Sequence, residues 1–393
     1  MVPQSVSPER VAAACEEALT RLKEHHLRPL AGSQGNVVFI SGEYNGVWLE
    51  HVFDGVVWAQ LTGEGAVARE EADLFLRHQK ADGQLPCFVW ESKIGYSQLQ
   101  ECVSFGALCL DVYRLTEDGD FLRRAYEGLV RWDGWLCANR MRVDDLIDTY
   151  CGYDTGHDNS GRLAEWKYPG ATPSRDAAVE PDDCAVAPLL CPDVNAVFYG
   201  DRKAIAEMAA LLGETQAATA WAAKAEATRL ALIAACRGED GFFYDVDKAG
   251  QRRPCRSISI TNVFTEGVLP SEEVRALFDR FFRDPAAFGT PFPYPSVAAN
   301  DATFTKRTAG NGWGYWCQGL TMLRTLRWMK RCGLETELHE NMRKWLAAWT
   351  DCELRFGQEI DPFTGEPSPC SPYYSSTMLF YLTSAKELGL WSK

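Results

Sequence analysis

The sequence predicts an all-α protein whose helical hairpins close into a toroid, an (α/α)6 ring with short strands in its loops. Three observations lead to this prediction. Apolar residues recur at helical spacing in about eleven or twelve segments, strand signals are few and short, and no repeat of fixed period indicates a solenoid. Twelve helices in antiparallel pairs would form six hairpins, so we expect one domain over residues 1–393.

The first predicted helix follows Ser7 and Pro8, residue types that favour the N-cap and the first helical position. Apolar residues from Val11 to Leu22 then recur at helical spacing. The same spacing predicts further helices over residues 52–61, 64–80, 97–115, 118–137, 194–212, 215–236, 271–282, 313–332, 334–350 and 372–388.

Strands are predicted only at residues 36–40, 242–245 and 257–260, and they do not alternate with helices as a parallel sheet would require. Several connections between the predicted helices are long and rich in Gly, Pro, Asp and aromatic residues. Long ordered loops in a compact helical fold usually carry function. We therefore expect the site in these loops, at one rim of the ring.

Charge and composition exclude several classes of partner. The formal net charge is −14, and no run of Lys and Arg offers the basic surface that nucleic acid requires. No segment reaches the ~18 apolar residues of a membrane span, and the first ten residues lack the features of a secretion signal. We therefore expect a cytoplasmic protein without a nucleic-acid or membrane partner.

The 14 cysteines occur singly, without the paired Cys/His spacing of a zinc site. They are expected to be reduced and to act mostly as small apolar residues. No metal site is predicted.

Two loop segments combine carboxylates with aromatic residues and glycine, namely Tyr153–Ser160 and Gln358–Glu366. Either one alone fits an ordinary turn with Asx capping. Together they fit the cleavage of a glycosidic bond with inversion, which needs a protonated carboxyl and an ionised carboxylate ~6.5–9.5 Å apart. The acid protonates the leaving oxygen, and the base activates water on the opposite face of the sugar.

These segments resemble motifs of the six-hairpin glycosidases of clan G, which include family 63 α-glucosidases, mannosylglycerate hydrolases and, more distantly, trehalases. Tyr153–Ser160 is similar to W-E-S-G-x-D-N-S, in which the Asp before Asn-Ser is the general acid, so the resemblance assigns this role to Asp158. Gln358–Glu366 is similar to E-x-Y-x-P-x-T-G-E, in which the first Glu is the general base, and we assign this role to Glu359.

Four further segments appear in the order of that family, and the resemblance covers roughly residues 45–388. They are Gln79–Pro86, Asp193–Ala196, Gly241–Asp245 and Gly314–Trp316. Two departures concern the sugar site. Cys317-Gln318-Gly319 stands where the family has Arg-Gly-Pro after Tyr-Trp, and the early W-x-W-D signature is lost around Trp48. The resemblance therefore implies the family's hydrolytic mechanism for this chain, but it does not imply the same substrate.

Polar and aromatic side chains in or near these loops are the candidates for binding the saccharide, because a sugar offers apolar ring faces and hydroxyl edges. Each also has a structural interpretation: core packing for an aromatic residue, capping for Asp154, and a satisfied structural hydrogen bond for Asn195 and Gln318. The candidates are His51, Tyr153, Asp154, His157, Asn159, Trp166, Asn195, Trp313, Trp316 and Gln318.

The sequence thus predicts an inverting glycoside hydrolase that cleaves a small α-glucoside or α-mannoside without a cofactor. Two alternatives stay open. Six-hairpin toroids also include sugar isomerases and epimerases, which would use paired histidines on inner helices. A carbohydrate-binding protein without activity is compatible with the missing Arg. No oligomeric state is predicted.

Overall fold

The computed structural model describes residues 6–41, 44–163, 176–180, 187–306, 311–350, 352 and 356–392. Twelve α-helices lie within these residues. None of them combines the length and the apolar composition needed to cross a membrane. The helices are α1 (Pro8–Arg21), α2 (Val52–Thr62), α3 (Gly65–Arg77), α4 (Phe105–Thr116), α5 (Gly119–Arg140), α6 (Pro192–Leu211), α7 (Thr215–Cys236), α8 (Ile260–Glu266), α9 (Ser271–Leu277), α10 (Gly319–Thr325), α11 (Glu335–Thr350) and α12 (Ser375–Glu387).

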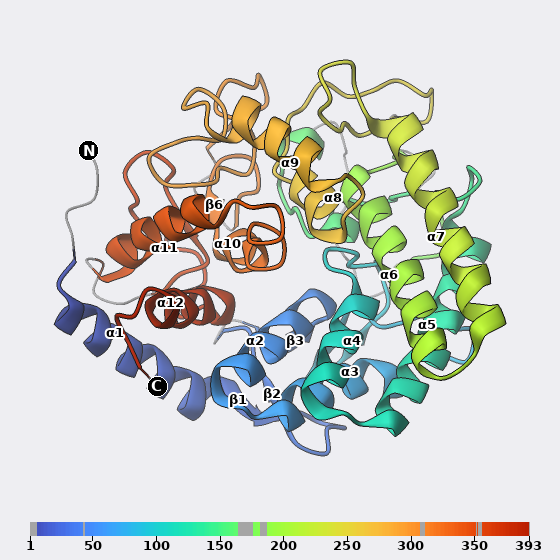
Figure 1. The fold of residues 1–393 in the computed structure, drawn as a ribbon, viewed down its shortest axis with the longest axis horizontal. Helices are drawn as coiled ribbons and strands as arrows, with labels where there is room; N and C mark the ends of the chain where they lie inside the picture. The colour runs from blue at the N-terminus through green and yellow to red at the C-terminus, as the bar shows by residue number, and fades with distance from the viewer. Residues whose placement is uncertain are drawn as a thin grey trace.

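The even-numbered helices form a closed inner ring. Each contacts the next, from α2 through α4, α6, α8 and α10 to α12, and α12 returns to α2. Odd-numbered helices lie outside: α3 packs against α2 and α4, α7 against α6, and α1 and α11 against α12 (Figure 1). This double-walled ring of helical hairpins confirms the predicted (α/α)6 toroid.

The sequences of the helices explain their layers. In α2, every residue from Val52 to Ala59 is buried, as expected for a helix without a polar face. The outer helix α7 buries only a stripe, which runs through Trp221, Ala225, Thr228, Leu232 and Cys236 at helical spacing. An inner helix therefore contacts neighbours on all sides, whereas an outer helix keeps one face in water.

Short antiparallel strands pair segments of the loops with one another. β1 (Leu27–Pro29) pairs with β2 (Asn36–Val38), which confirms the strand predicted there. β3 (Gly46–Trp48), β4 (Phe88–Trp90) and β5 (Ile94–Gly95) form a three-stranded sheet. β6 (Cys317–Gln318) pairs with β7 (Glu359–Ile360), with Gln318 opposite Glu359. This last pair joins the segment before α10 to the segment that leads to α12.

Four predicted elements were wrong in extent or type. The helix predicted over 97–115 begins only at Phe105, where Ser104 caps the helix by accepting from the Ala107 N–H. The helix predicted over 313–332 begins at Gly319. Within residues 242–245 a single residue, Phe243, forms an isolated bridge, to Arg237, and no strand is present there. The strand predicted at 257–260 leads into α8. Short apolar runs fit a helix and a strand equally well, so tertiary contacts decide between them.

Candidate active site

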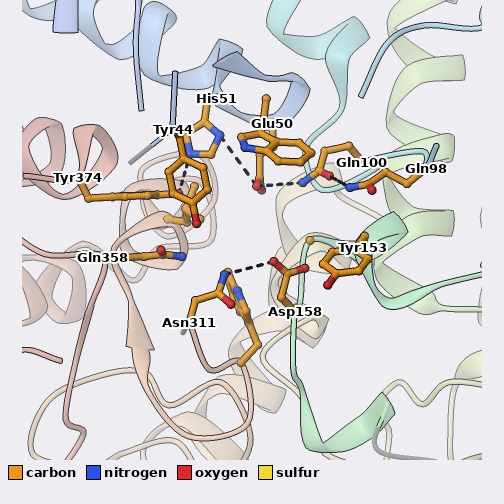
Figure 2. A pocket seen from close by; sticks show the side chains of 14 residues that line it. Tyr44, Glu50, His51, Gln98, Gln100, Tyr153, Asp158, Asn311, Gln358 and Tyr374 are labelled. Atoms are coloured by element: carbon orange, nitrogen blue, oxygen red, sulfur yellow. Dashed lines mark hydrogen bonds and ion pairs between the residues drawn. The ribbon is translucent and has the colours of Figure 1, made fainter. Parts of the chain in front are cut away.

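A pocket of about 450 Å³ opens at one end of the ring. Its wall comes from segments that precede the N-termini of the inner helices α2, α4, α6, α10 and α12, together with Leu320 in the first turn of α10 (Figure 2). These are the loops in which the sequence predicted a site. The lining residues are Tyr44, Trp48, Glu50, His51, Gln98, Gln100, Tyr153, Gly156, Asp158, Asn311, Trp313, Leu320, Gln358 and Tyr374.

Asp158 lies in the wall of this pocket, on the loop that follows the 3-10 turn Gly152–Thr155. Burial, and then the charge of Glu50, raise the pKa of Asp158 to about 7, while a hydrogen bond from Asn311 opposes this shift. That bond runs from Nδ2 of Asn311 to Oδ2 of Asp158 over 3.2 Å. A carboxyl group with a pKa near 7 holds a proton for part of the time at neutral pH, as a general acid must.

The loop that carries Asp158 is fixed at its start by Asp154. This side chain is fully buried, forms an ion pair with Arg140 at 2.8 Å, and accepts from the backbone N–H groups of Leu99 and Tyr150. Asp154 was predicted to bind a sugar hydroxyl. That prediction is wrong, because its oxygens are taken up in holding the backbone and Arg140.

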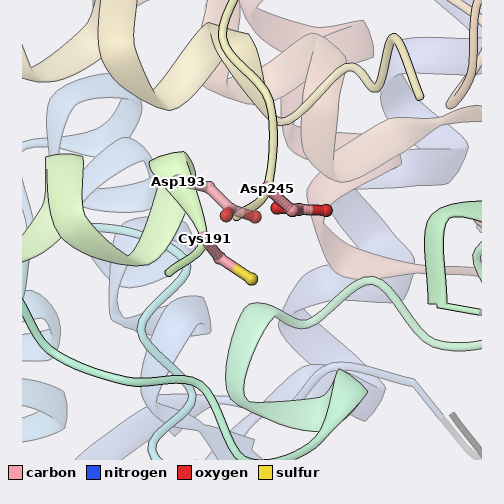
Figure 3. Close-up of side chains that lie close together, drawn as sticks. All are labelled: Cys191, Asp193 and Asp245. Carbon is pink, nitrogen blue, oxygen red and sulfur yellow. The ribbon is translucent and has the colours of Figure 1, made fainter. Parts of the chain in front are cut away.

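The same loop is fixed at its other end by Arg162. Its guanidinium donates to both oxygens of Asp193, at 3.0 and 3.1 Å, and its Nε lies 3.3 Å from Asp245. Figure 3 shows the two carboxylates close together, with the thiol of Cys191 beside them. Arg162 supplies the cation that balances these buried charges, so we assign the cluster a structural role.

Glu359 does not reach the pocket. Its side chain is 0% exposed, and it accepts hydrogen bonds from Gly312 N, Gln318 Nε2 and Ser368 Oγ at 3.1, 2.7 and 2.8 Å. Neighbouring side chains on a strand point to opposite sides, and Gln358 is the one that lines the pocket (Figure 2). Glu359 thus lies outside the wall of the pocket that would hold the sugar and its attacking water.

The assignment of the general base to Glu359 is therefore corrected. In E-x-Y-x-P-x-T-G-E the base stands four positions before the proline. Counted back from Pro362, with Thr364, Gly365 and Glu366 in register, this position is Gln358. An amide does not take up a proton at neutral pH. Gln358, at the position of the family's base, therefore cannot act as a general base.

His51, Tyr153 and Trp313 were predicted to bind the sugar, and all three line the pocket. Burial lowers the pKa of His51 to about 4, so its ring is neutral at pH 7 and bonds through Nε2 to the hydroxyl of Tyr374 at 2.8 Å. Trp313 stacks on His157, with ring centroids 4.3 Å apart. His157 thus lies behind the wall and supports Trp313 rather than facing the pocket.

The remaining predicted ligands lie elsewhere. Asn195 is buried in α6 and bonds to the backbone of Ile147, so its assignment as a sugar ligand is wrong. The same holds for Gln318, which donates to Glu359, and for Trp316, which is buried outside the lining set. Asn159 is exposed and donates to Asn311 at the edge of the site. Trp166 lies outside the described residues.

Sequence reasoning missed the polar residues Glu50, Gln98, Gln100, Asn311 and Gln358. A signal existed for two of them, because Gln98 and Gln100 alternate with an apolar residue and hence lie on one side of an extended segment. Glu50 carried no signal. Among the described lining residues His51 is the one histidine, so the paired histidines expected for an isomerase do not meet in this pocket.

Comparison with known proteins gives two results. A family model described as "Mannosylglycerate hydrolase MGH1-like glycoside hydrolase domain" matches residues 51–377, which confirms the predicted resemblance. No curated protein matches the sequence of this chain.

Solved structures resemble the fold across the ring. A GH63 mannosylglycerate hydrolase from Thermus thermophilus, in complex with glucose, has 16% sequence identity and a TM-score of 0.74, over 95% of this chain and 99% of that chain. The neutral trehalase from Saccharomyces cerevisiae has 13% identity and a TM-score of 0.65, over 89% and 73%. A bacterial glucoamylase complexed with acarbose has 12% identity and a TM-score of 0.57, over 86% and 48%.

Proposed function

This chain belongs to the family of mannosylglycerate hydrolase MGH1-like glycoside hydrolase domains, and we propose that it cleaves a small α-glycoside with Asp158 as the general acid. One observation carries this proposal. Asp158 faces a pocket of about 450 Å³ with a pKa of about 7, so a protonated carboxyl is available to the leaving oxygen. The pocket volume falls in the lower part of the ~300–1,000 Å³ range of small-molecule sites, which favours a short saccharide.

The remaining wall suits a sugar ring. Trp48, Trp313 and Tyr153 offer aromatic surface to the apolar face of a pyranose. Among the described residues, Gln98 Oε1 is buried and has no hydrogen-bond partner, so it can accept from a sugar hydroxyl. The Nδ1 atom of His51 lies 4.0 Å from Glu50 Oε1. The names of the similar structures, a mannosylglycerate hydrolase and a trehalase, support an α-mannosyl or α-glucosyl unit as the part that enters the pocket.

The proposed reaction is hydrolysis with inversion. The Asp158 carboxyl donates its proton to the glycosidic oxygen as that bond breaks, and a water molecule attacks the anomeric carbon from the other face. Asn311 holds the carboxyl of Asp158 in place through its hydrogen bond. A second group beside the sugar must take a proton from the attacking water.

A second candidate function, sugar binding without turnover, is favoured by one observation: an amide, Gln358, stands in the position of the family's base. The two functions differ in a simple measurement. A binding protein would give calorimetric saturation with a glycoside but release no free sugar on long incubation.

The test is a panel of α-glucosides, α-mannosides and glycosyl-glycerates incubated with the wild type and with Asp158→Asn. We expect the wild type to release a reducing sugar from at least one compound, and Asp158→Asn to do so about 10²–10⁴-fold more slowly. Equal rates for the two proteins on every cleaved compound would refute the role of Asp158.

A further inference from the structure

We propose that Glu50 is the second catalytic carboxylate of this pocket and activates the water in place of the missing base. This inference rests on the proposed hydrolysis and deepens it. Glu50 lies in the stretch around Trp48 where the W-x-W-D signature is lost, and it directly precedes the region matched by the family model, residues 51–377, so neither assigns it a role.

Glu50 and Asp158 are the two acidic side chains among the described residues of the pocket wall. Gln358 is an amide, and the three donors around Glu359 hold its carboxylate outside the lining set. Hydrolysis with inversion needs two carboxyl groups beside the same sugar. Glu50 and Asp158 both line the pocket and can fill these two roles.

The carboxylates of Glu50 and Asp158 point toward the same hollow from different sides of the pocket (Figure 2). Glu50 comes from the 3-10 turn Leu49–His51 before α2, and Asp158 from the loop before α6. The negative charge of Glu50 contributes to the raised pKa of Asp158, so the two groups interact through the space between them. This arrangement favours the protonated form of Asp158.

Glu50 is held in place and still has acceptor capacity. Its side chain is 7% exposed, its Oε1 accepts from Gln100 Nε2 at 3.1 Å, and its Oε2 forms an ion pair with Arg324 of α10. The charge of Arg324 compensates the burial of the carboxylate. Each oxygen of an ionised carboxylate has two lone pairs, so each can still accept a proton from water.

Atoms and charge balance in the proposed step. Water forms a bond from its oxygen to the anomeric carbon, and one of its protons passes to Glu50. The bond between the anomeric carbon and the glycosidic oxygen breaks, and the proton of Asp158 passes to that oxygen. The products are a free sugar and an alcohol, and exchange with solvent then returns the proton from Glu50 to Asp158.

The test compares Glu50→Gln with a matched control, Glu70→Gln, on a glycoside that the wild type cleaves. Glu70 is also a nearly buried glutamate with a single arginine partner, Arg77, but it lies outside the pocket wall. We expect Glu50→Gln to lower kcat about 10²–10⁴-fold with a much smaller change in KM, and Glu70→Gln to keep kcat within about threefold. Thermal denaturation of both variants checks that they fold.

Two more variants separate catalysis from structure. Azide added to Glu50→Ala should restore turnover and yield a glycosyl azide, because a small anion can take the place of the activated water. A structural role of Glu50 gives no such product. In the double variant Glu50→Gln/Gln358→Glu, the carboxylate moved to position 358 should restore part of the lost kcat.

The outcomes distinguish this inference from the proposed function. If Asp158→Asn is slow but Glu50→Gln keeps the wild-type rate, Glu50 is not the base and the proposed hydrolysis stands. If the wild type is inert and Gln358→Glu alone gains activity, the inference is overturned, because Glu50 does not replace the missing base. If every protein binds sugar and none cleaves it, the proposed function fails and the inference fails with it.

Discussion

Asn311 donates a hydrogen bond from Nδ2 to Oδ2 of Asp158 over 3.2 Å, and this bond opposes the effect of burial on the pKa of the carboxyl. A donor stabilises the ionised form of a carboxylate, so it lowers the pKa. Burial prevails, and the pKa stands at about 7. Asn311 therefore influences the pH at which Asp158 loses its proton.

Asn311→Ala should move the activity profile toward higher pH. Loss of the hydrogen bond raises the pKa of Asp158, so the protonated acid persists to a higher pH. A hydrogen bond worth about 1 kcal/mol corresponds to a shift of about 0.7 pH units in the alkaline limb of kcat/KM. Asn139→Ala, which removes a hydrogen bond on α5 away from the pocket, should leave that limb unchanged. A shift to lower pH after Asn311→Ala would contradict the role of this hydrogen bond.

Asp158→Asn should stabilise the protein above pH 7. The pKa of Asp158 is about 7 in the folded state, against about 3.9 for an unfolded Asp, so folding favours the protonated form. The stabilisation from this group is complete below pH ~4 and is lost as the pH rises through about 7. Asn does not ionise, so at pH 8 the variant should melt at a higher temperature than the wild type, by about 5 °C if the whole shift is expressed. The difference should vanish near pH 4, and a variant that is less stable at pH 8 would argue against the shift.

Arg162→Met should weaken both the fold and the activity. The substitution leaves Asp193 and Asp245 buried together without their cation, which typically costs about 3–5 kcal/mol. It also releases the end of the loop that carries Asp158, so kcat should fall. Arg114→Met, which breaks exposed ion pairs with Asp111 and Glu207, is the control and should cost less than about 1 kcal/mol. Chemical denaturation measures both, and equal losses would indicate that the cluster does not stabilise the loop.

Gly156→Ala should displace the loop before Asp158. The backbone of Gly156 has a φ of 68°, and a Cβ placed there would lie 2.4 Å from Cys102 Sγ. Both the left-handed conformation and this contact oppose alanine, so we expect a loss of more than about 1 kcal/mol of stability and a lower kcat. At Gly63 the φ is also positive, but the space is open, so Gly63→Ala isolates the conformational effect. Equal effects of the two substitutions on kcat would contradict the proposed displacement.

Much of the fold was predictable from the sequence, because the apolar spacing of the helices is strong. The stripe of α7 and the N-cap at Ser7 are examples of signals that the structure follows. The start of α4 was not predictable, because Leu99 donates to Asp154 and Gln100 to Glu50, residues that are brought close only by the ring. The spacing of apolar residues along the sequence gives no information about such long-range contacts.

The site was predicted less completely, for two physical reasons. A shift of one residue along a strand reverses the side that a side chain faces, so Glu359 was chosen where Gln358 reaches the pocket. Loops at the end of a ring also bury backbone N–H groups that need acceptors, and Asp154 and Asn195 serve this need. From sequence alone, such residues look like sugar ligands.

The role of Asp158 as proton donor is best tested by comparing leaving groups in Asp158→Asn. A methyl or glyceryl α-glycoside needs a proton on its leaving oxygen, whereas an α-glycosyl fluoride departs with little help from an acid. We predict that Asp158→Asn cleaves the alkyl glycoside about 10²–10⁴-fold more slowly than the wild type and the fluoride at nearly the wild-type rate. Equal losses on both substrates, or no loss on either, would contradict the assignment of Asp158 as the proton donor.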